Sequence, residues 1–436
     1  MVKRRDFIKM AGAAGLGLSA AGWSMLAAAD GVAAPVAVGV PTNTGIKGRV
    51  VVIGGGMAGA TVAKYLRIWG GTGVDVTLIE RDSAYSSNIM SNLVLNGSRT
   101  MSSLQYGYGN LTSRYGVKMV KGDVATIDPV GRSVTLASGT RYAYDRLVVA
   151  PGVDFDILPG LETAAAQAKV PHAWKAGPQT TALRNMITAM PNGGVFVMSI
   201  PGKPYRCPPG PYERACVVAD WLKKNRPGSK VIVLDANPGI TAEVHSFTDA
   251  FNVVHAGVIE YQPNVTINSV DATNMTVNTS IGNIHGNVLN LIPPHRAGKV
   301  IAANGLADSG GKWTSVDVLS YEAKVAPGIH VIGDASATTQ PKAGHIANQE
   351  AKVCADAILR LFSGRALDPS PHTNSACYSP ITFETASWLT ANFAYDPVTK
   401  TMQPVAPSSG EAAARSKDNF EEMNKWFTAL MGDSFA

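Results

Sequence analysis

The sequence of 436 residues is poor in charged side chains, which make up 16% of it, and has no run of five or more charges of one sign. A nucleic-acid-binding surface is therefore not indicated, because such surfaces gather lysine and arginine in patches or stripes. The sequence also lacks a C-x-x-C-H motif and any cysteine–histidine spacing typical of a metal site. Neither attached haem nor a bound metal is therefore expected on this chain.

The first 29 residues have the layout of an export signal. The basic segment Lys3–Lys9 (KRRDFIK) resembles a twin-arginine signal, a weakly apolar stretch follows over Met10–Leu26, and three alanines precede Asp30. We expect residues 1–29 to be a signal peptide, residues 30–47 to be a linker, and the protein to reside in the periplasm, where disulfides persist. An uncleaved N-terminal anchor is the alternative.

A glycine-rich turn follows the first predicted strand, Arg49–Ile53, and precedes a predicted helix over Thr61–Trp69. Its Gly54, Gly56 and Gly59 form a G-x-G-x-x-G motif in the strand–turn–helix context that a dinucleotide requires. The first glycine permits the tight turn, the second lets the backbone approach a pyrophosphate, and the third lets helix and strand pack closely. The motif therefore predicts a dinucleotide site at the helix N-terminus.

Two further segments extend this site. A predicted strand over Val74–Ile79 ends at Glu80, which lies 21 residues after Gly59 and can hydrogen-bond a ribose hydroxyl. The segment Tyr144–Asp154 is predicted to be a strand that leads into a turn at Gly152. The strand, the helix and Glu80 together favour the dinucleotide interpretation over a mere turn.

The segment Gly328–Ser336 (GIHVIGDAS) resembles the strand–Gly–Asp motif of FAD-containing reductases with two dinucleotide domains. That resemblance implies FAD as the cofactor, with Gly333 and Asp334 at its ribityl chain. A predicted helix over Gly344–Leu361 would then face the flavin ring, and Lys342 just before it would offset charge on reduced flavin. His295 and His345 are weaker candidates, for contact with the flavin region or for capping loops.

The order of these segments predicts an α/β fold with two Rossmann-like dinucleotide-binding domains and a smaller C-terminal α+β interface domain. The inserted second domain has a loop over Pro201–Glu213 whose prolines remove amide donors that a pyrophosphate needs, so NADH binding there is disfavoured. The predicted boundaries are 48–154 and 285–364 for a split FAD domain, 155–284 for an NADH-like domain without an NAD site, and 365–436 for the C-terminal domain.

Four cysteines allow three complete pairings, and the residues alone do not choose among them. The segment YRCPPGPYERA at 205–215 is similar to the flavin-binding subunit of flavocytochrome c sulfide dehydrogenase, and the similarity extends over most of the chain, including NSACYSP at 374–380. It implies a redox-active disulfide between Cys207 and Cys377 beside the flavin, with Glu213 as a nearby acid. A structural staple is the alternative for that pair. Cys216 and Cys354 are expected to be buried on helices.

The same resemblance implies oxidation of sulfide with transfer of electrons to a c-type cytochrome, whose haem would lie on a separate chain. In that family the flavin is often tethered through a cysteine in the segment matching Tyr85–Asn92. Asn88 stands at that position, so we expect FAD to be held non-covalently.

Two other functions stay open: a sulfide:quinone oxidoreductase on the membrane surface, and a flavoprotein that enhances a sulfur-oxidising complex without turnover of its own. The apolar stripe predicted over Asp418–Gly432 is more often core packing than a membrane contact, so membrane association is not favoured.

Overall fold

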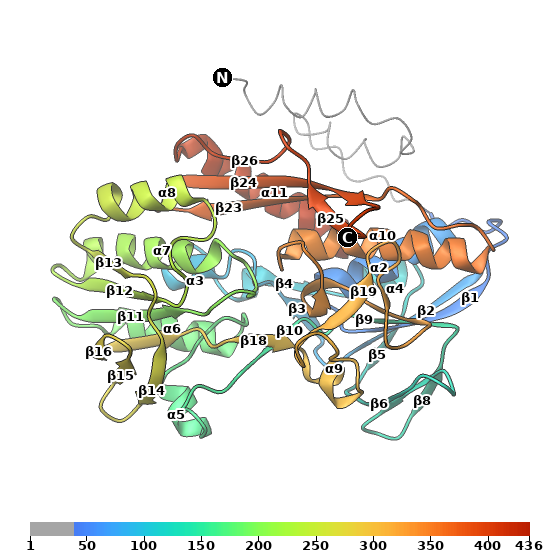
Figure 1. Ribbon diagram of the computed structural model, residues 1–436, viewed down its shortest axis with the longest axis horizontal. Helices are drawn as coiled ribbons and strands as arrows, with labels where there is room; N and C mark the ends of the chain where they lie inside the picture. The colour runs from blue at the N-terminus through green and yellow to red at the C-terminus, as the bar shows by residue number, and fades with distance from the viewer. Residues whose placement is uncertain (1–38) are drawn as a thin grey trace.

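The computed structural model of the protein describes residues 39–436, so the predicted signal peptide and the first part of the predicted linker lie outside the described residues. Two mainly parallel sheets lie side by side, and an antiparallel C-terminal sheet lies above them in the view of Figure 1. This is the predicted α/β fold with two Rossmann-like units. We call the unit on the larger sheet the first unit and the other the second unit.

The first unit is built on a sheet of eight strands in the order β22-β19-β20-β21-β9-β1-β2-β5. Its centre is parallel, because β1 pairs with β2 and β9, and β9 pairs with β21. Segments from both ends of the sequence therefore complete one sheet. The strands are β1 (Gly48–Ile53), β2 (Val74–Glu80), β5 (Lys118–Lys121), β9 (Arg146–Val149), β19 (Thr314–Asp317), β20 (Glu322–Ala323), β21 (Ile329–Val331) and β22 (Ser336–Ala337).

Two long helices belong to the first unit and pack against each other. Helix α2 (Met57–Gly70) follows the glycine-rich turn, and α10 (Gly344–Phe362) follows the Gly333–Asp334 turn. Both predicted helices are confirmed, and the α10 helix ends just before Gly364, whose φ of 67° suits a helix stop. The central strand β1 is buried over Val50–Ile53, which explains its continuous apolar sequence.

The second unit is built on a four-stranded parallel sheet in the order β13-β12-β11-β17. Its strands are β11 (Val195–Ile200), β12 (Lys230–Asp235), β13 (Ile259–Gln262) and β17 (Val288–Leu291). Helix α7 (Gly210–Asn225) connects β11 to β12, and Glu213 lies in its first turn. Its first turn contains a proline, which fits there because that turn has no intrahelical use for the amide.

The two units are joined by an antiparallel ribbon of β10 (Val153–Phe155) and β18 (His295–Ala297). The C-terminal sheet consists of β23 (His372–Pro380), β24 (Ala386–Asp396), β25 (Thr401–Pro404) and β26 (Gly410–Glu411). Strand β23 contacts α10 of the first unit and α7 of the second. The C-terminal segment thus bridges both units (Figure 1).

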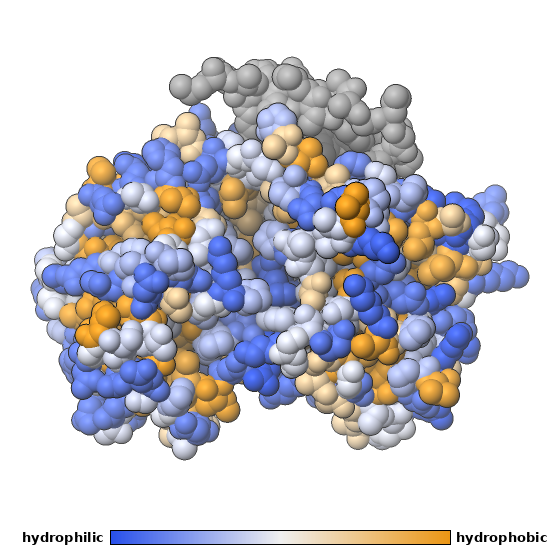
Figure 2. Space-filling model, in the orientation of Figure 1, coloured by the Kyte–Doolittle hydropathy of each residue, from blue (hydrophilic) through white to orange (hydrophobic). Residues whose placement is uncertain are grey.

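Helix α11 (Lys417–Phe435) packs on α2 and on the C-terminal sheet. Its apolar stripe is buried at Met423, Phe427, Leu430 and Met431, which confirms the interpretation as core packing. No helix within residues 39–436 is long and apolar enough to cross a bilayer. On the face shown in Figure 2, apolar side chains form small groups scattered among hydrophilic ones over both units.

Shorter elements complete the described chain. They are β3 (Ala84–Ser86), α3 (Asn92–Leu95), β4 (Gln105–Gly107), α4 (Gly109–Ser113), β6 (Val124–Asp128), β7 (Ser133–Leu136), β8 (Arg141–Ala143), α5 (Ala164–Lys169), α6 (Pro178–Thr188), α8 (Val244–Asp249), β14 (Ile267–Asp271), β15 (Thr276–Thr279), β16 (Gly282–His285) and α9 (Lys299–Ala303).

Candidate active site

The glycine-rich turn between β1 and α2 has the geometry of a phosphate-binding loop. Gly54 has a φ of 96°, and a Cβ at Gly59 would lie 1.7 Å from the Gly54 carbonyl oxygen, so neither position accepts a side chain. Gly56 differs, because a Cβ there would meet only Tyr85, at 3.8 Å. Packing therefore does not require glycine at this position, and the backbone of Gly56 is open to the close approach of a ligand.

Glu80 ends β2 and faces this turn, as the sequence predicts. Its Oε2 accepts a hydrogen bond from the Gly55 amide at 2.6 Å, and its Oε1 accepts one from the Asp82 amide at 3.0 Å. The carboxylate is thus fixed beside the loop, at the place where a ribose hydroxyl would approach. Gly152, in the turn after β9, has a φ of 69° and its carbonyl accepts the Gly298 amide at 2.9 Å.

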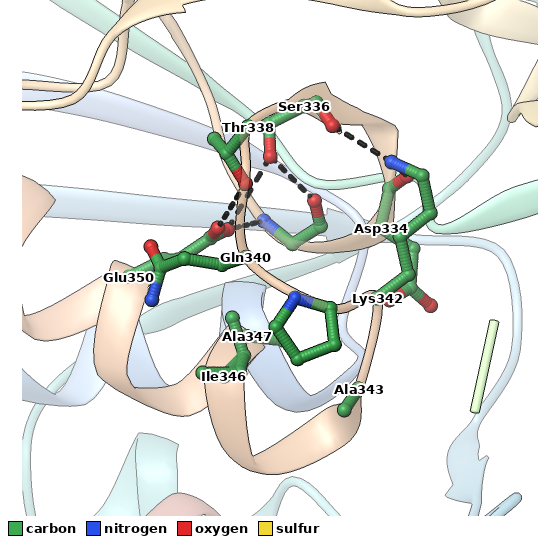
Figure 3. Close-up of a pocket in the computed structure, with 11 residues that line it drawn as sticks. Asp334, Ser336, Thr338, Gln340, Lys342, Ala343, Ile346, Ala347 and Glu350 are labelled. Carbon is green, nitrogen blue, oxygen red and sulfur yellow. Dashed lines mark hydrogen bonds between the residues drawn. The ribbon is translucent and has the colours of Figure 1, made fainter. Parts of the chain in front are cut away.

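The strand–Gly–Asp turn follows β21 and lies near the N-terminus of α10 (Figure 3). Gly333 has a φ of 71°, and its amide donates to Glu350 Oε2 at 2.6 Å. Asp334 Oδ1 is buried and makes no hydrogen bond within the described residues. Burial also raises the pKa of Asp334. An unsatisfied buried acceptor is costly, and the hydroxyl donors of a ribityl chain would satisfy it.

Lys342 lies beside this turn, although its ammonium is already engaged. Its Nζ donates to the carbonyl oxygens of Asp334 at 2.9 Å and Ser336 at 2.8 Å, and it lies 3.9 Å from the centre of the Trp313 ring. Burial lowers the pKa of Lys342. The side chain therefore orders the Asp334 turn, and its predicted effect on reduced flavin would act from that position.

Cys207 lies in the loop before α7, with a φ of 60° that non-glycine residues rarely adopt. Its amide donates to the Lys342 carbonyl at 2.7 Å, which ties this loop to the first unit. A Cβ at Gly210 would lie 2.7 Å from Cys207 Sγ, so the helix start must be glycine for the thiol to fit. The structure therefore brings Cys207 next to the predicted flavin-binding turn.

Cys377 lies on β23. Burial raises the pKa of the Cys207 thiol, and charge on Cys377 raises it further. Burial raises the pKa of Cys377 to about 12. Both thiols are free in this structure, so the disulfide stays a prediction. Cys216 and Cys354 are fully buried on α7 and α10, as expected of packing residues.

Glu213 lies in the first turn of α7 and is buried. Its Oε1 accepts a hydrogen bond from Asn92 Nδ2 at 3.0 Å, and burial raises its pKa to about 8. The neighbouring Arg214 lowers that pKa only partly. At neutral pH Glu213 therefore holds a proton close to the cysteine pair.

Arg214 is buried and donates four well-formed hydrogen bonds, two to side chains and two to carbonyl oxygens, at 2.8 to 2.9 Å. These partners belong to α3, β17 and the loop before α6, so one guanidinium fixes three segments around Glu213. They are Asn92, Asn290, His172 and Ala173.

Two histidines have structural positions near the site. His345 Nδ1 accepts the Ala376 amide at 3.0 Å and so positions the residue before Cys377. His295 is buried with its ring 4.9 Å from that of Phe155. Burial lowers the pKa of His345 to about 4 and that of His295 to about 2, so both are neutral at physiological pH.

In the second unit, protein groups engage the carboxylate at the end of β12. Asp235 ends β12, where a ribose-binding carboxylate would lie in a Rossmann fold. It is fully buried, and its Oδ2 accepts hydrogen bonds from the hydroxyls of Tyr212 at 2.8 Å and Tyr261 at 2.7 Å. This carboxylate is therefore sequestered, and the lack of an NAD site in this unit stays a prediction.

Sequence reasoning missed Glu243, Glu350 and Asn92. Glu243 is buried near Cys377, Glu350 holds the Gly333 amide, and Asn92 binds both Glu213 and Arg214. None of them belongs to a motif with a fixed spacing. Within the described residues, no group of three or more His, Cys, Asp or Glu side chains is arranged to hold a metal ion.

The glycine-rich turn, the unsatisfied Asp334 and the two Rossmann-like units are those of an FAD-binding flavoprotein with a disulfide-reductase-like fold. Residues 48–183 match the family described as pyridine nucleotide-disulphide oxidoreductase. Within that class, residues 180–293 match the family described as sulfide dehydrogenase (flavocytochrome c) flavoprotein chain, central.

Curated relatives and solved structures agree with this class. A probable ferredoxin reductase of Castellaniella defragrans is 37% identical over 24% of this chain and 26% of its own length. The mitochondrial sulfide:quinone oxidoreductase of Mus musculus is 23% identical over 66% of this chain and 65% of its own. The chain thus matches less than two thirds of either relative.

Among solved structures, the sulfide:quinone oxidoreductase of Aquifex aeolicus superposes with a TM-score of 0.67 at 18% identity, covering 88% of this chain and 92% of that one. A NAD-dependent persulfide reductase from A. fulgidus gives a TM-score of 0.61 at 14% identity, covering 88% and 77%. At these identities the likeness shows the shared fold.

Proposed function

We propose that this protein is a sulfide dehydrogenase flavoprotein that oxidises sulfide through Cys207, Cys377 and FAD, and passes the electrons to a c-type cytochrome on another chain. The hydrogen bond from the Cys207 amide to the Lys342 carbonyl carries the proposal, because it holds the cysteine loop against the Asp334 turn. The family match over residues 180–293 supports a sulfur compound as the electron donor.

The chemistry begins with hydrosulfide, a soft nucleophile that attacks a disulfide sulfur. Attack on a Cys207–Cys377 disulfide forms one S–S bond to hydrosulfide as the old S–S bond breaks, which leaves one persulfide and one thiolate. Burial raises the pKa of Glu213 to about 8, so this carboxyl is protonated at neutral pH. Glu213 can therefore give a proton to that thiolate and recover it later. FAD, when bound, supplies an acceptor for two electrons that can release them singly to haem.

The test is anaerobic addition of sulfide to the FAD-loaded protein while flavin absorbance is followed. We expect bleaching within seconds in the parent protein, and FAD retention without bleaching in Cys207→Ser. Cys354→Ala is the matched control, because it removes a buried cysteine from α10 that the chemistry does not use. Full bleaching in Cys207→Ser would refute the disulfide mechanism.

A sulfide:quinone oxidoreductase is the second candidate, favoured by the similarity to the mouse and Aquifex enzymes. Burial of the apolar stripe of α11 in the protein's own core supports the cytochrome instead, because that stripe is not available to a membrane. Reoxidation of bleached protein by decylubiquinone but not by cytochrome c would establish the second candidate. An enhancer without turnover would fail to bleach at all.

We also propose that FAD is bound without a covalent tether and that the protein works in the periplasm. Asn88 Oδ1 accepts hydrogen bonds from the Ala176 amide at 2.8 Å and from Arg206 at 3.4 Å, so this side chain is engaged with protein groups. Fractionation of the native host tests the compartment, and co-purification with a haem spectrum tests the cytochrome partner.

A further inference from the structure

Glu243 is a buried carboxyl that belongs to no recognised sequence motif. It precedes α8, is 2% exposed, and has a φ of 49°. Its Oε1 accepts a hydrogen bond from Ser379 Oγ at 2.6 Å, whereas its Oε2 is buried and has no partner within the described residues. A carboxylate with one unsatisfied buried oxygen is costly, so the protonated form is favoured.

The hydrogen bond to Ser379 connects Glu243 to the strand that carries Cys377. Ser379 follows Cys377 by two residues on β23, and because side chains alternate along a strand, the two lie on the same face. Ser387 lies opposite Ser379 on β24 and its hydroxyl contacts Ser246 Oγ at 2.7 Å. Glu243, Ser379, Ser387 and Ser246 therefore form a small polar cluster at the strand that carries Cys377.

The carboxylates that raise the pKa of Cys377 are not the same as those that raise the pKa of Cys207. After burial, negative charge on Glu243 is the largest influence that raises the pKa of Cys377, and Glu213 contributes less. For Cys207, the influence of a carboxylate comes from Glu213. Glu213 thus acts on both sulfurs, whereas Glu243 is the stronger of the two carboxyls at Cys377.

We propose that Glu243 is the proton-holding residue of Cys377, as Glu213 is of Cys207, so that each sulfur of the pair has its own buried carboxyl. This inference rests on the proposed function. Glu243 makes no hydrogen bond to a sulfur, so it acts by positioning a proton and a charge. When the disulfide opens with Cys377 as the leaving thiolate, protonated Glu243 gives that thiolate its proton and becomes the carboxylate. The proton returns when the disulfide reforms.

Several other titratable groups face Glu243. They are Glu213 and Cys216 on α7, Cys377 on β23, and Glu411 on β26. Burial raises the pKa of Glu243 to about 7, and the charge of Glu411 raises it further, while the hydroxyls of Ser379 and Ser387 lower it. Because the charge of Glu411 raises the pKa of Glu243, the control Glu411→Gln should move the bend that Glu243 causes in the pH profile of Cys377 alkylation to lower pH and leave the alkylation rate at pH 9 unchanged.

The test uses the FAD-loaded Cys207→Ser variant, in which Cys377 is a single thiol, and follows its alkylation by iodoacetamide from pH 6 to 10 through the mass of the Cys377 peptide. Ionised Glu243 raises the pKa of the Cys377 thiol and so reduces the fraction of thiolate. A plot of the alkylation rate against pH should therefore bend near pH 7. Adding Glu243→Gln should remove the bend and speed alkylation at pH 9 about tenfold, which corresponds to one unit of thiol pKa. At pH 6 the rates should coincide.

Two outcomes would overturn the inference. One is an unchanged profile in Glu243→Gln. The other is equal acceleration at pH 6 and pH 9, which would indicate loosened packing instead of a charge effect. Ser379→Ala gives a second measurement, because loss of its hydrogen bond raises the pKa of Glu243 and should move the bend to higher pH. Alkylation needs no sulfide, so failure here is distinct from a failure of parent protein to bleach with sulfide.

Discussion

Replacing Gly56 by alanine should weaken FAD binding without disturbing the fold. The added Cβ would meet only Tyr85 Cε2, at 3.8 Å, and the φ of −74° is open to alanine. The methyl group would, however, stand where the backbone approaches the pyrophosphate. Loss of one charged hydrogen bond costs about 1.5 to 3 kcal/mol. Because 1.4 kcal/mol is tenfold in affinity, the Kd for FAD should rise about 10- to 150-fold.

The assay is titration of apoprotein with FAD, followed by flavin fluorescence, together with the thermal midpoint of the apoprotein. Gly202→Ala is the matched control, because Gly202 occupies the corresponding loop of the second unit and a Cβ there would meet nothing within 4 Å. Gly59→Ala should instead lower the thermal midpoint, since its Cβ would lie 1.7 Å from a carbonyl oxygen. An unchanged Kd for FAD in Gly56→Ala would refute the placement of the pyrophosphate.

Two further predictions concern the cofactor and pH. Denaturation in guanidinium should release all FAD into the supernatant, and yellow colour left on precipitated protein would show a covalent tether. The free energy of unfolding should be largest near about pH 6.5. Three buried carboxyls, Glu213, Glu243 and Glu350, have pKa values of about 8, 7 and 8 in the folded protein. Above about pH 6.5 they still hold protons that the same carboxyls have lost in the unfolded chain, so the free energy of unfolding falls as pH rises toward 8. On the acid side of the maximum, buried histidines with pKa values of about 4 or less stay neutral while the unfolded chain takes up protons, so stability falls with pH. Urea titrations across this range check the position of the maximum.

The dinucleotide half of the site could be predicted because its signals are local. Gly54, Gly56 and Gly59 lie within six residues of one another, and the motif requires only a strand before it and a helix after it. The turn at Asp334 could be predicted for the same reason, because its signal is also contained in one short segment. Both the split sheet and the two Rossmann-like units follow once these turns are recognised.

The acid groups were harder to predict, because their properties arise from contacts between distant segments. Glu243 meets Ser379 across 136 residues, and Asn92 meets Glu213 across 121. Burial decides the pKa of each carboxyl, and burial is a property of the packed fold. Asp235 is a similar case: its place at the end of β12 could be read from the pattern, but its sequestration by two tyrosines could not.

The hydrogen bond between the Cys207 amide and the Lys342 carbonyl also has a mechanical consequence. The two Rossmann-like units are joined by the narrow β10–β18 ribbon, about which they could otherwise rotate. This bond, together with the contacts of β23 to both α7 and α10, resists such rotation on both sides of the cysteine pair. The distance between the sulfurs is therefore set by three separate attachments. A protein restrained in this way should keep the Cys207 loop against the Asp334 turn whether the two thiols are joined or free.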